Sequence, residues 1–194
     1  ASAHVVVLPQ ASQSEDRGED AAQMWRDGGA SDVVNLVDLT DRARARELLE
    51  RADLIWLGGG DQSRLMAALE EAQLVDCVRA RYAAGATVAG TSAGAAVMSL
   101  LMITGDGDES LTRIARGTTV LATGLGLLPG TIVDQHFVRR QRNNRLLSVV
   151  LEHPDEVGLG IDERTAAVVS GSRVEVLGEG SIVGSLVGAL IMTT

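Results

Sequence analysis

The stretch AGATVAGTSAGAAVMS, residues 84–99, holds its one central serine, Ser92, in a run of small residues. Residues 90–94, Gly-Thr-Ser-Ala-Gly, have the Gly-x-Ser-x-Gly spacing of a nucleophile elbow, in which a strand turns sharply into a helix and lifts the serine hydroxyl above the sheet. Such a turn leaves no room for large side chains, which accounts for the glycine and alanine around it. Because the chain has 22 glycines, an ordinary strand-to-helix turn is the alternative interpretation.

The composition predicts one compact α/β domain over residues 1–194. With 45% apolar but only 2% aromatic residues, the core has to be filled mainly by Val, Leu, Ile and Ala, which suits strands covered by helices on both faces. The formal net charge of −9 repels phosphate backbones, so nucleic acid is not an expected partner. The single cysteine, Cys77, cannot form an intramolecular disulfide and is expected as a small core residue on a helix.

No part of the sequence has the ~18 uninterrupted apolar residues that a membrane span needs. The apolar tail, residues 181–194, is broken by Gly184 and Gly188, and we expect it to be a buried terminal strand. No charged and apolar signal is seen at the start, so a cytoplasmic protein is expected. Secretion stays open, because residue 1 is alanine and the chain begins almost directly on a strand.

Apolar β-branched runs alternate with helical periods through the first half of the chain. This alternation implies right-handed crossovers and a three-layer α/β fold, with a mainly parallel sheet flanked by helices. Strands are predicted within 4–12, 32–39, 53–60 and 86–90, and helices near 19–27, 42–52 and 63–85, with Asp41 and Ser63 as caps. In the second half we expect a loop at 104–110, a strand leading to Phe137, a helix over 139–154 and antiparallel strands joined by glycine turns over 156–184.

Four polar groups follow predicted strands, and the carboxyl ends of parallel strands are where ligands bind in open sheets. These groups are residues 58–62 (GGGDQ), Ser92, residues 134–137 (DQHF) and residues 162–163 (DE). A serine needs a base to take its proton, and histidine has the pKa for that task. Of the three histidines, only His136 is expected at a strand end beside polar partners, although a satisfied loop histidine is the alternative.

Glu163 is the carboxylate that could orient the His136 imidazole, as the third member of a triad does. The chain order would then be serine, histidine, acid. In α/β-hydrolases the acid precedes the histidine, so this order argues against a lipase-like hydrolase.

Five ordered motifs together carry a resemblance to a known family. They are GGGDQ, GTSAGAAVMS, GLGLL, VDQHFVRRQRNNRL and GLGIDERTA, and they extend over nearly the whole chain, from about His4 to Val176. The chain resembles the cyanophycinases and the related peptidase E dipeptidases of the S51 serine peptidases, and its His136 motif is nearer to the cyanophycinase branch. The resemblance implies a class I glutamine-amidotransferase-like sheet and a catalytic triad of Ser92, His136 and Glu163.

The resemblance also implies the substrate: peptides linked through aspartyl residues, and in cyanophycinase the β-aspartyl-arginine isopeptide bond. The oxyanion formed on attack by Ser92 would be held by the backbone N–H of Ala93 and by that of Gly59 or Gly60. Glycine lets the backbone itself approach the substrate. No cofactor and no metal are expected, because the histidines and the cysteine have no metal-ligand spacing.

The family match assigns further residues to substrate binding: Gln62, Asp134, Gln135, Arg140, Arg142 and Arg145. In DERTA, Thr165 and Glu163 flank Arg164, which would place Thr165 near the same pocket. Structurally, Gln62 and Asp134 would serve equally well as caps. The run RRQRNNR, residues 139–145, would place Arg142 and Arg145 on one helix face, where they could pair with substrate carboxylates. A solvated basic face is the alternative, and Arg139 does not match the family pattern. Asn144 stands where the family commonly has glycine, and asparagine tolerates a left-handed turn.

The sequence therefore predicts a serine peptidase acting on an aspartyl-containing peptide or cyanophycin, with a homodimer as one expected assembly. An α-aspartyl or isoaspartyl dipeptidase of peptidase E type is the alternative enzyme. A catalytically silent binding module of the same fold is the alternative from another class.

Overall fold

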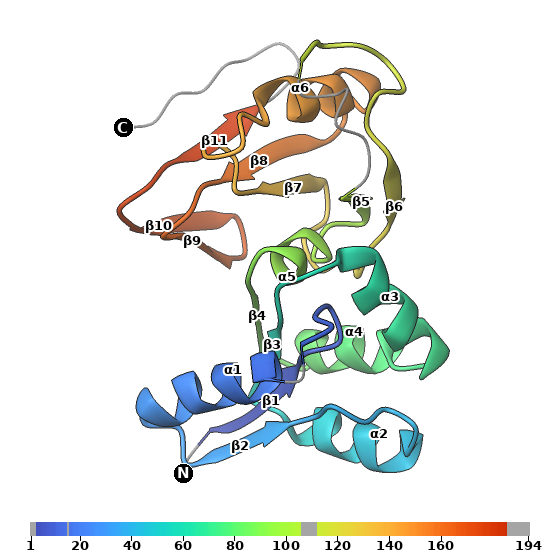
Figure 1. The fold of residues 1–194 in the computed structure, drawn as a ribbon, viewed down its shortest axis with the longest axis vertical. Helices are drawn as coiled ribbons and strands as arrows, with labels where there is room; N and C mark the ends of the chain where they lie inside the picture. Colours follow the sequence, from blue (N-terminus) through green and yellow to red (C-terminus); the bar gives the residue numbers. More distant parts are fainter. Residues whose placement is uncertain (1–2, 15, 106–111, 186–194) are drawn as a thin grey trace. The chain divides into compact units, whose positions relative to one another are not determined.

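The computed structural model describes residues 3–14, 16–105 and 112–185. The chain divides into two compact units, Ala1–Val97 and Met98–Thr194 (Figure 1). The single domain over residues 1–194 stays a prediction. Of the loop expected at 104–110, residues 106–110 lie outside the described residues.

The first unit is built on a parallel sheet with the strand order β2-β1-β3-β4. Its strands are β1 (His4–Leu8), β2 (Asp32–Asn35), β3 (Leu54–Leu57) and β4 (Thr87–Gly90). Strand β1 is paired on both sides, and all five of its residues are buried, as expected for an apolar β-branched run in a parallel sheet. Strand β2 ends earlier than the predicted 32–39 run.

Helices cover both faces of this sheet. On one face, Val5 and Val7 pack with Ala22 of α1 (Asp16–Asp27), and Trp25 meets Trp56 edge to face with ring centroids 5.5 Å apart. On the other face Val6 and Leu8 are fully buried, and helix α2 (Arg42–Arg51) contacts β1. The predicted α/β fold, with a parallel sheet flanked by helices, is confirmed.

The helix predicted over 63–85 is two helices, α3 (Gln62–Glu71) and α4 (Val75–Ala83). The chain turns between them at Gln73, whose φ of 58° is left-handed and cannot continue a helix. The prediction of Ser63 as the cap is wrong, because the Asp61 carboxylate accepts hydrogen bonds from the backbone N–H groups of Ser63 and Arg64. Asp41 caps α2 as predicted, and Cys77 is buried on α4.

The second unit has a three-stranded sheet in the order β11-β8-β7. Strands β7 (Thr131–Gln135) and β8 (Val157–Ile161) are parallel, and β11 (Ile182–Ser185) is antiparallel to β8. Helix α6 (Asn143–Glu152) packs on this sheet through a core that includes Ile132, Phe137 and Leu146. The pair β5 (Leu101–Ile103) and β6 (Leu121–Thr123) was not predicted. Only residues 182–185 of the predicted terminal strand are described.

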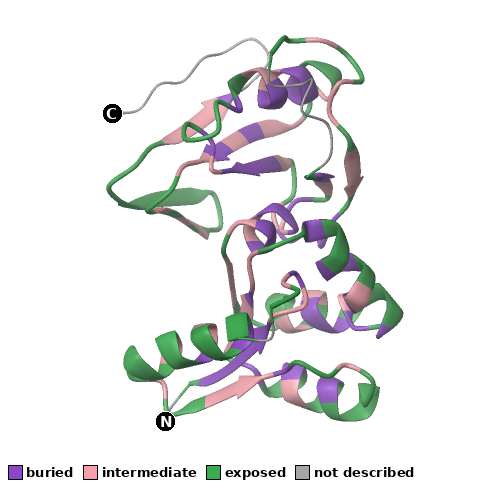
Figure 2. Cartoon of the chain, in the orientation of Figure 1, coloured by how far each residue is buried: buried purple, intermediate pink, exposed green. Residues whose placement is uncertain are grey.

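The predicted antiparallel hairpin is formed by β9 (Thr165–Ser170) and β10 (Arg173–Gly178). All six residues of β10 are exposed, among them Val174 and Val176 (Figure 2). Gly171 makes the turn with a φ of 57°, which favours glycine. The hairpin follows directly after Glu163, so it begins at the candidate catalytic carboxylate.

None of the helices in the described parts of the chain is long and apolar enough to cross a membrane.

Candidate active site

Ser92 stands in a strained turn between strand β4 and the short helix α5 (Ala93–Ala96). Its backbone has φ of 51° and ψ of −110°, a region that L-residues rarely adopt. Holding a residue in such a region costs about 1–3 kcal/mol and occurs mainly at functional sites. The turn predicted from the Gly-x-Ser-x-Gly spacing is therefore a strand-to-helix elbow and not an ordinary, relaxed one.

The two glycines of the motif are needed for close packing. A Cβ on Gly90 would lie 2.5 Å from the backbone of Gly94. A Cβ on Gly94 would overlap the carbonyl group of Leu57 at the end of β3. Because backbone atoms cannot yield as a flexible side chain does, any side chain at these positions would displace the elbow.

The glycine loop at the end of β3 lies beside the serine. Strands β3 and β4 are parallel neighbours in register, with Leu57 opposite Gly90, so their carboxyl ends meet at one edge. A Cβ on Gly59 would stand 3.5 Å from the Cβ of Ser92, whereas one on Gly60, with φ of 142°, would overlap the Ala11 carbonyl. The structure thus brings Gly59 next to the serine.

Three backbone N–H groups near this serine have no acceptor among the described residues: those of Gly59, Gly60 and Ala93. By contrast, the Gly58 N–H donates to Leu8 and the Asp61 N–H donates to Ala11. An oxyanion hole consists of such preorganised donors. The three residues predicted for this role therefore retain the hydrogen-bonding capacity that it requires.

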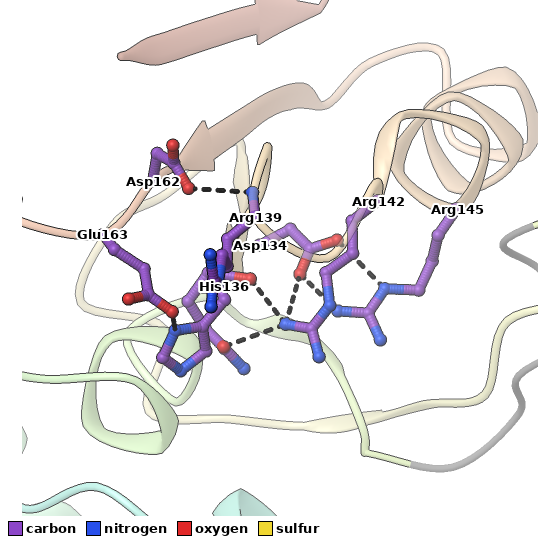
Figure 3. A network of polar contacts seen from close by, with 8 residues as sticks. Asp134, His136, Arg139, Arg142, Arg145, Asp162 and Glu163 are labelled. Atoms are coloured by element: carbon purple, nitrogen blue, oxygen red, sulfur yellow. Dashed lines mark hydrogen bonds and ion pairs between the residues drawn. The ribbon is translucent and has the colours of Figure 1, made fainter. Parts of the chain in front are cut away.

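His136 and Glu163 form a pair in the second unit. The Nδ1 atom of His136 lies 3.1 Å from Oε1 of Glu163 (Figure 3). The pair follows from strand register, because Gln135 is opposite Ile161, His136 comes directly after Gln135, and Glu163 is two residues after Ile161. Their side chains are 25% and 47% exposed, so the imidazole is the more sheltered of the two.

The backbone around this pair is fixed by local contacts. His136 has a left-handed φ of 52°, and its carbonyl accepts a hydrogen bond of 2.9 Å from the Arg140 N–H. The Asp162 carboxylate accepts a hydrogen bond of 3.1 Å from the Arg139 N–H. The Thr165 hydroxyl donates to the Glu163 carbonyl at 3.1 Å, and the place of Thr165 near a substrate pocket stays a prediction.

Phe137 anchors the histidine segment in the core. Its ring is 1% exposed and lies over Gly160 of β8, where a Cβ would stand 2.5 Å from the ring atoms. The Phe137 N–H also donates to the Ile161 carbonyl at 3.2 Å. Sequence reasoning missed Phe137 and Gly160 as supports of the site, although the GLGI motif contains this glycine.

Two of the predicted substrate-binding arginines are buried in an ion-pair network with Asp134 (Figure 3). Arg145 is bidentate to the Asp134 carboxylate, with Nε 2.9 Å from Oδ2. Nη1 of Arg142 lies 2.9 Å from Oε1 of Gln135 and 3.5 Å from Oδ1 of Asp134. Burial, and then the charge of Arg145, lowers the pKa of Arg142 to about 10 against the opposing effect of Asp134.

The helix predicted over 139–154 begins later, at Asn143, so the arginine run is not helical at its start. The left-handed residue is Gln141, with φ of 53°, whereas Asn144 lies within α6, so the expectation of a turn at Asn144 is wrong. This turn before α6 leaves Arg140 exposed while Arg142 and Arg145 are turned inward. A uniformly solvated basic face is therefore excluded.

A sequence model of peptidase family S51 matches residues 1–177. The chain belongs to peptidase family S51.

The similar proteins carry peptidase names. This S51 chain is 40% identical over 188 residues to a cyanophycinase of Trichormus variabilis, covering 93% of the chain and 62% of that protein. It is 31% identical over 153 residues to peptidase E of Actinobacillus pleuropneumoniae, covering 75% of the chain and 62% of that protein. The chain thus spans about 62% of the length of these two curated relatives.

Solved structures share the fold. A peptidase from an acI-B1 Actinobacterium has a TM-score of 0.69 at 22% identity, covering 98% of this chain and 83% of that one. A putative peptidase E from Listeria monocytogenes EGD-e has a TM-score of 0.67 at 18% identity, covering 92% and 87%. At these identities the likeness concerns the S51 fold alone.

The residues predicted for this S51 site lie in both units. The first unit holds Gly59, Gly60, Gln62, Ser92 and Ala93, with Gln62 buried at the start of α3. The second unit holds His136, Glu163 and the other predicted substrate-binding residues. The triad and the substrate contacts stay predictions. Within the described residues, no group of three or more His, Cys, Asp or Glu side chains could hold a metal ion.

Proposed function

We propose that the chain is a serine peptidase that hydrolyses aspartyl-linked peptides, with the β-aspartyl-arginine isopeptide bond of cyanophycin or its fragments as the substrate. The observation that carries the proposal is the His136–Glu163 pair, with Nδ1 and Oε1 3.1 Å apart. A carboxylate on Nδ1 leaves Nε2 of the imidazole as the atom that takes a proton. The strained backbone at Ser92 and membership of a peptidase family support the same reading.

In the proposed reaction, Ser92 Oγ attacks the carbonyl carbon of the isopeptide bond while His136 accepts the hydroxyl proton. The carbonyl oxygen becomes an oxyanion, which the N–H groups of Ala93 and Gly59 stabilise; loss of one such donor typically costs about 3–4 kcal/mol in barrier. The intermediate then collapses, the C–N bond breaks, and the imidazolium gives its proton to the leaving amine.

The acyl-enzyme that remains is hydrolysed by the same groups in reverse. His136 takes a proton from water, the hydroxide attacks the ester carbonyl, and the proton returns to Ser92 as the C–O bond breaks. Glu163 stays ionised and stabilises the imidazolium that forms in both halves of the reaction. The products are an aspartyl peptide or aspartate and the free amine.

For substrate binding, we propose Arg140, Gln62 and Thr165. Arg140 is exposed on the turn that follows His136, and a guanidinium there suits an α-carboxylate of the substrate. Gln62 and Thr165 would supply polar contacts to the aspartyl backbone.

An α-aspartyl or isoaspartyl dipeptidase is the second candidate, because peptidase E is among the relatives at 31% identity. We would incubate the purified protein with cyanophycin, β-Asp-Arg and α-linked Asp-X dipeptides and follow release of free amine. Cleavage of α-linked Asp-X alone would refute the isopeptide assignment. Binding of an aspartyl substrate without turnover would favour a silent binding module.

The matched variants are Ser92→Ala and Ser63→Ala. The first should abolish turnover and leave the circular dichroism spectrum unchanged, whereas the second alters an exposed serine and should keep wild-type rates. Full activity in Ser92→Ala would remove the mechanism. His136→Ala and Glu163→Gln should both be strongly impaired, the histidine variant more than the other.

Assembly and location complete the proposal. We propose a homodimer, which light scattering coupled to size-exclusion chromatography would test directly. A cytoplasmic location stays a prediction, and fractionation of the source cells would test it.

A further inference from the structure

We propose that Arg142 and Arg145 act as positioning residues for His136 and do not bind the substrate. This inference rests on the proposed function, and it changes the assignment that the family pattern gave to these two arginines. A substrate ligand must present its donors where the substrate can reach them. A positioning residue is buried instead, donates to other groups of the protein and acts through the group that it holds.

Arg145 directs its Nε and Nη2 donors at Asp134. The guanidinium is bidentate to the carboxylate, with Nε to Oδ2 at 2.9 Å, and the two residues are only 4% and 1% exposed. A substrate carboxylate could take the place of Asp134 on the Arg145 guanidinium only by displacing it. The Asp134 carboxylate and the substrate carboxylate, two negative charges, would then lie close together in the interior. The two side chains thus form a buried ion pair (Figure 3).

Arg142 holds the peptide group in front of the histidine. Its Nη1 donates to the backbone carbonyl of Gln135, and this carbonyl shares one peptide plane with the N–H of His136. The same Nη1 donates to the side-chain Oε1 of Gln135 at 2.9 Å. Arg142 is 7% exposed, so these bonds form away from solvent and are stronger than at the surface.

The turn after His136 folds back to bring Arg142 to this position. The Arg142 N–H donates to the Phe137 carbonyl and the Arg140 N–H donates to the His136 carbonyl, each at 2.9 Å. His136 itself has a φ of 52°, a conformation that persists only when its surroundings enforce it. Arg142 therefore bonds to the residues on both sides of His136, through its side chain to Gln135 and through its backbone N–H to Phe137.

This arrangement matters because triad chemistry depends on small displacements. The imidazole has to keep Nδ1 at hydrogen-bonding distance from Glu163 while Nε2 meets the serine hydroxyl. A misplacement of about 1 Å can cost on the order of 100-fold in rate. Weakening the contacts of Arg142 and Arg145 with Gln135 and Asp134 should therefore lower kcat and leave KM nearly unchanged. Loss of a residue that binds the substrate should instead raise KM.

The kinetic test compares conservative variants of the same arginine run on β-Asp-Arg. We expect Arg142→Lys and Arg145→Lys to lower kcat at least tenfold with KM within twofold of wild type. Arg140→Lys, which alters the exposed arginine, should raise KM. Arg139→Lys is the control and should match wild type, because the hydrogen bond from Arg139 to Asp162 comes from the backbone N–H. A tenfold rise in KM at unchanged kcat in the first two variants would overturn the proposal.

A second measurement needs no catalysis. The ring signals of His136 in NMR spectra of the substrate-free protein, assigned with His136→Gln, should shift in Arg142→Lys and Arg145→Lys but not in Arg139→Lys. Unchanged ring signals in folded variants would overturn the positioning role. If the wild type cleaves no aspartyl substrate, the proposed function fails, yet the ring signals still decide whether the arginines hold the histidine.

A milder variant covers the case in which the lysine variants do not fold. Gln135→Met keeps the backbone carbonyl but removes the side-chain acceptor that Arg142 uses, and it changes no charge. We expect a smaller shift of the His136 ring signals in the same direction as for Arg142→Lys. His136 ring signals identical to those of wild type would count against the positioning role of Arg142.

Discussion

Replacing Asp134 by asparagine tests the buried network most directly, because it removes one charge and almost no volume. Asp134 is 1% exposed and is the carboxylate that both Arg142 and Arg145 meet. Asparagine would leave two guanidiniums in the interior without a counter-charge and would turn an amide NH₂ group toward N–H donors. Breaking a buried pair by removing one partner costs about 3–5 kcal/mol.

That loss is large against the total stability of a domain, which is about 5–15 kcal/mol. For a chain of 194 residues it corresponds to a drop in Tm of roughly 6–20 °C, at about 2–4 °C per kcal/mol. Thermal unfolding followed by circular dichroism would measure the drop. The control is Asp76→Asn, because Asp76 is 93% exposed and its contact with Arg79, at 3.4 Å, is a surface pair.

The control variant should unfold within experimental error of wild type. A loss below about 1 kcal/mol for Asp134→Asn would refute the reasoning, since an exposed pair typically contributes no more than that. It would mean that water reaches the guanidinium groups. Arg142 and Arg145 would then again be candidates for direct contact with substrate.

Three further predictions concern a packing contact, the strained serine and the cysteine. Gly160→Ala should lower the unfolding free energy by about 1–3 kcal/mol and reduce kcat, because the new methyl meets the rigid Phe137 ring; wild-type stability in urea titration would contradict this contact. Ser92→Gly should be inactive yet at least as stable as Ser92→Ala, since glycine relieves about 1–3 kcal/mol of strain against about 0.5–1 kcal/mol of added chain entropy. A Ser92→Gly variant clearly less stable than the alanine variant would show that the elbow is relaxed. Burial raises the pKa of the Cys77 thiol, so the thiolate fraction of Cys77 at pH 8 is reduced. A disulfide reagent should therefore label Cys77 at least tenfold more slowly in the folded than in the unfolded protein. Equal labelling rates would place this thiol at the surface.

Local patterns in the sequence were sufficient to place single groups. The elbow at Ser92 depends on Gly90 and Gly94, two positions away on either side. Both must be small, because a Cβ at either position would overlap neighbouring backbone atoms. His136 and Glu163 lie within two residues of the ends of β7 and β8, so their positions at strand ends follow from short-range periodicity. Such features depend on a few neighbouring residues, and these are visible in the sequence.

The arginine run shows what the sequence could not supply. A helical period over 139–145 would put Arg142 and Arg145 on one face, and they do converge, but on Asp134 of β7 and not on solvent. The left-handed turn at Gln141 decides this, and glutamine gives no local signal for that conformation. The burial of Arg142 and Arg145 likewise depends on Asp134, which lies 8 and 11 residues before them in the sequence.

The hairpin formed by β9 and β10 has a consequence for the motion of the proposed catalytic carboxylate. A two-stranded ribbon with exposed valines is only marginally stable by itself in water, so it is among the first segments expected to open in the native state. Its base is fastened at Arg164, whose carbonyl accepts the Glu179 N–H at 3.0 Å, one residue beyond Glu163. Amide hydrogen exchange along the ribbon should therefore report how often the glutamate leaves the imidazole, and slowing that exchange with a cross-link would lengthen the lifetime of the acid–base pair.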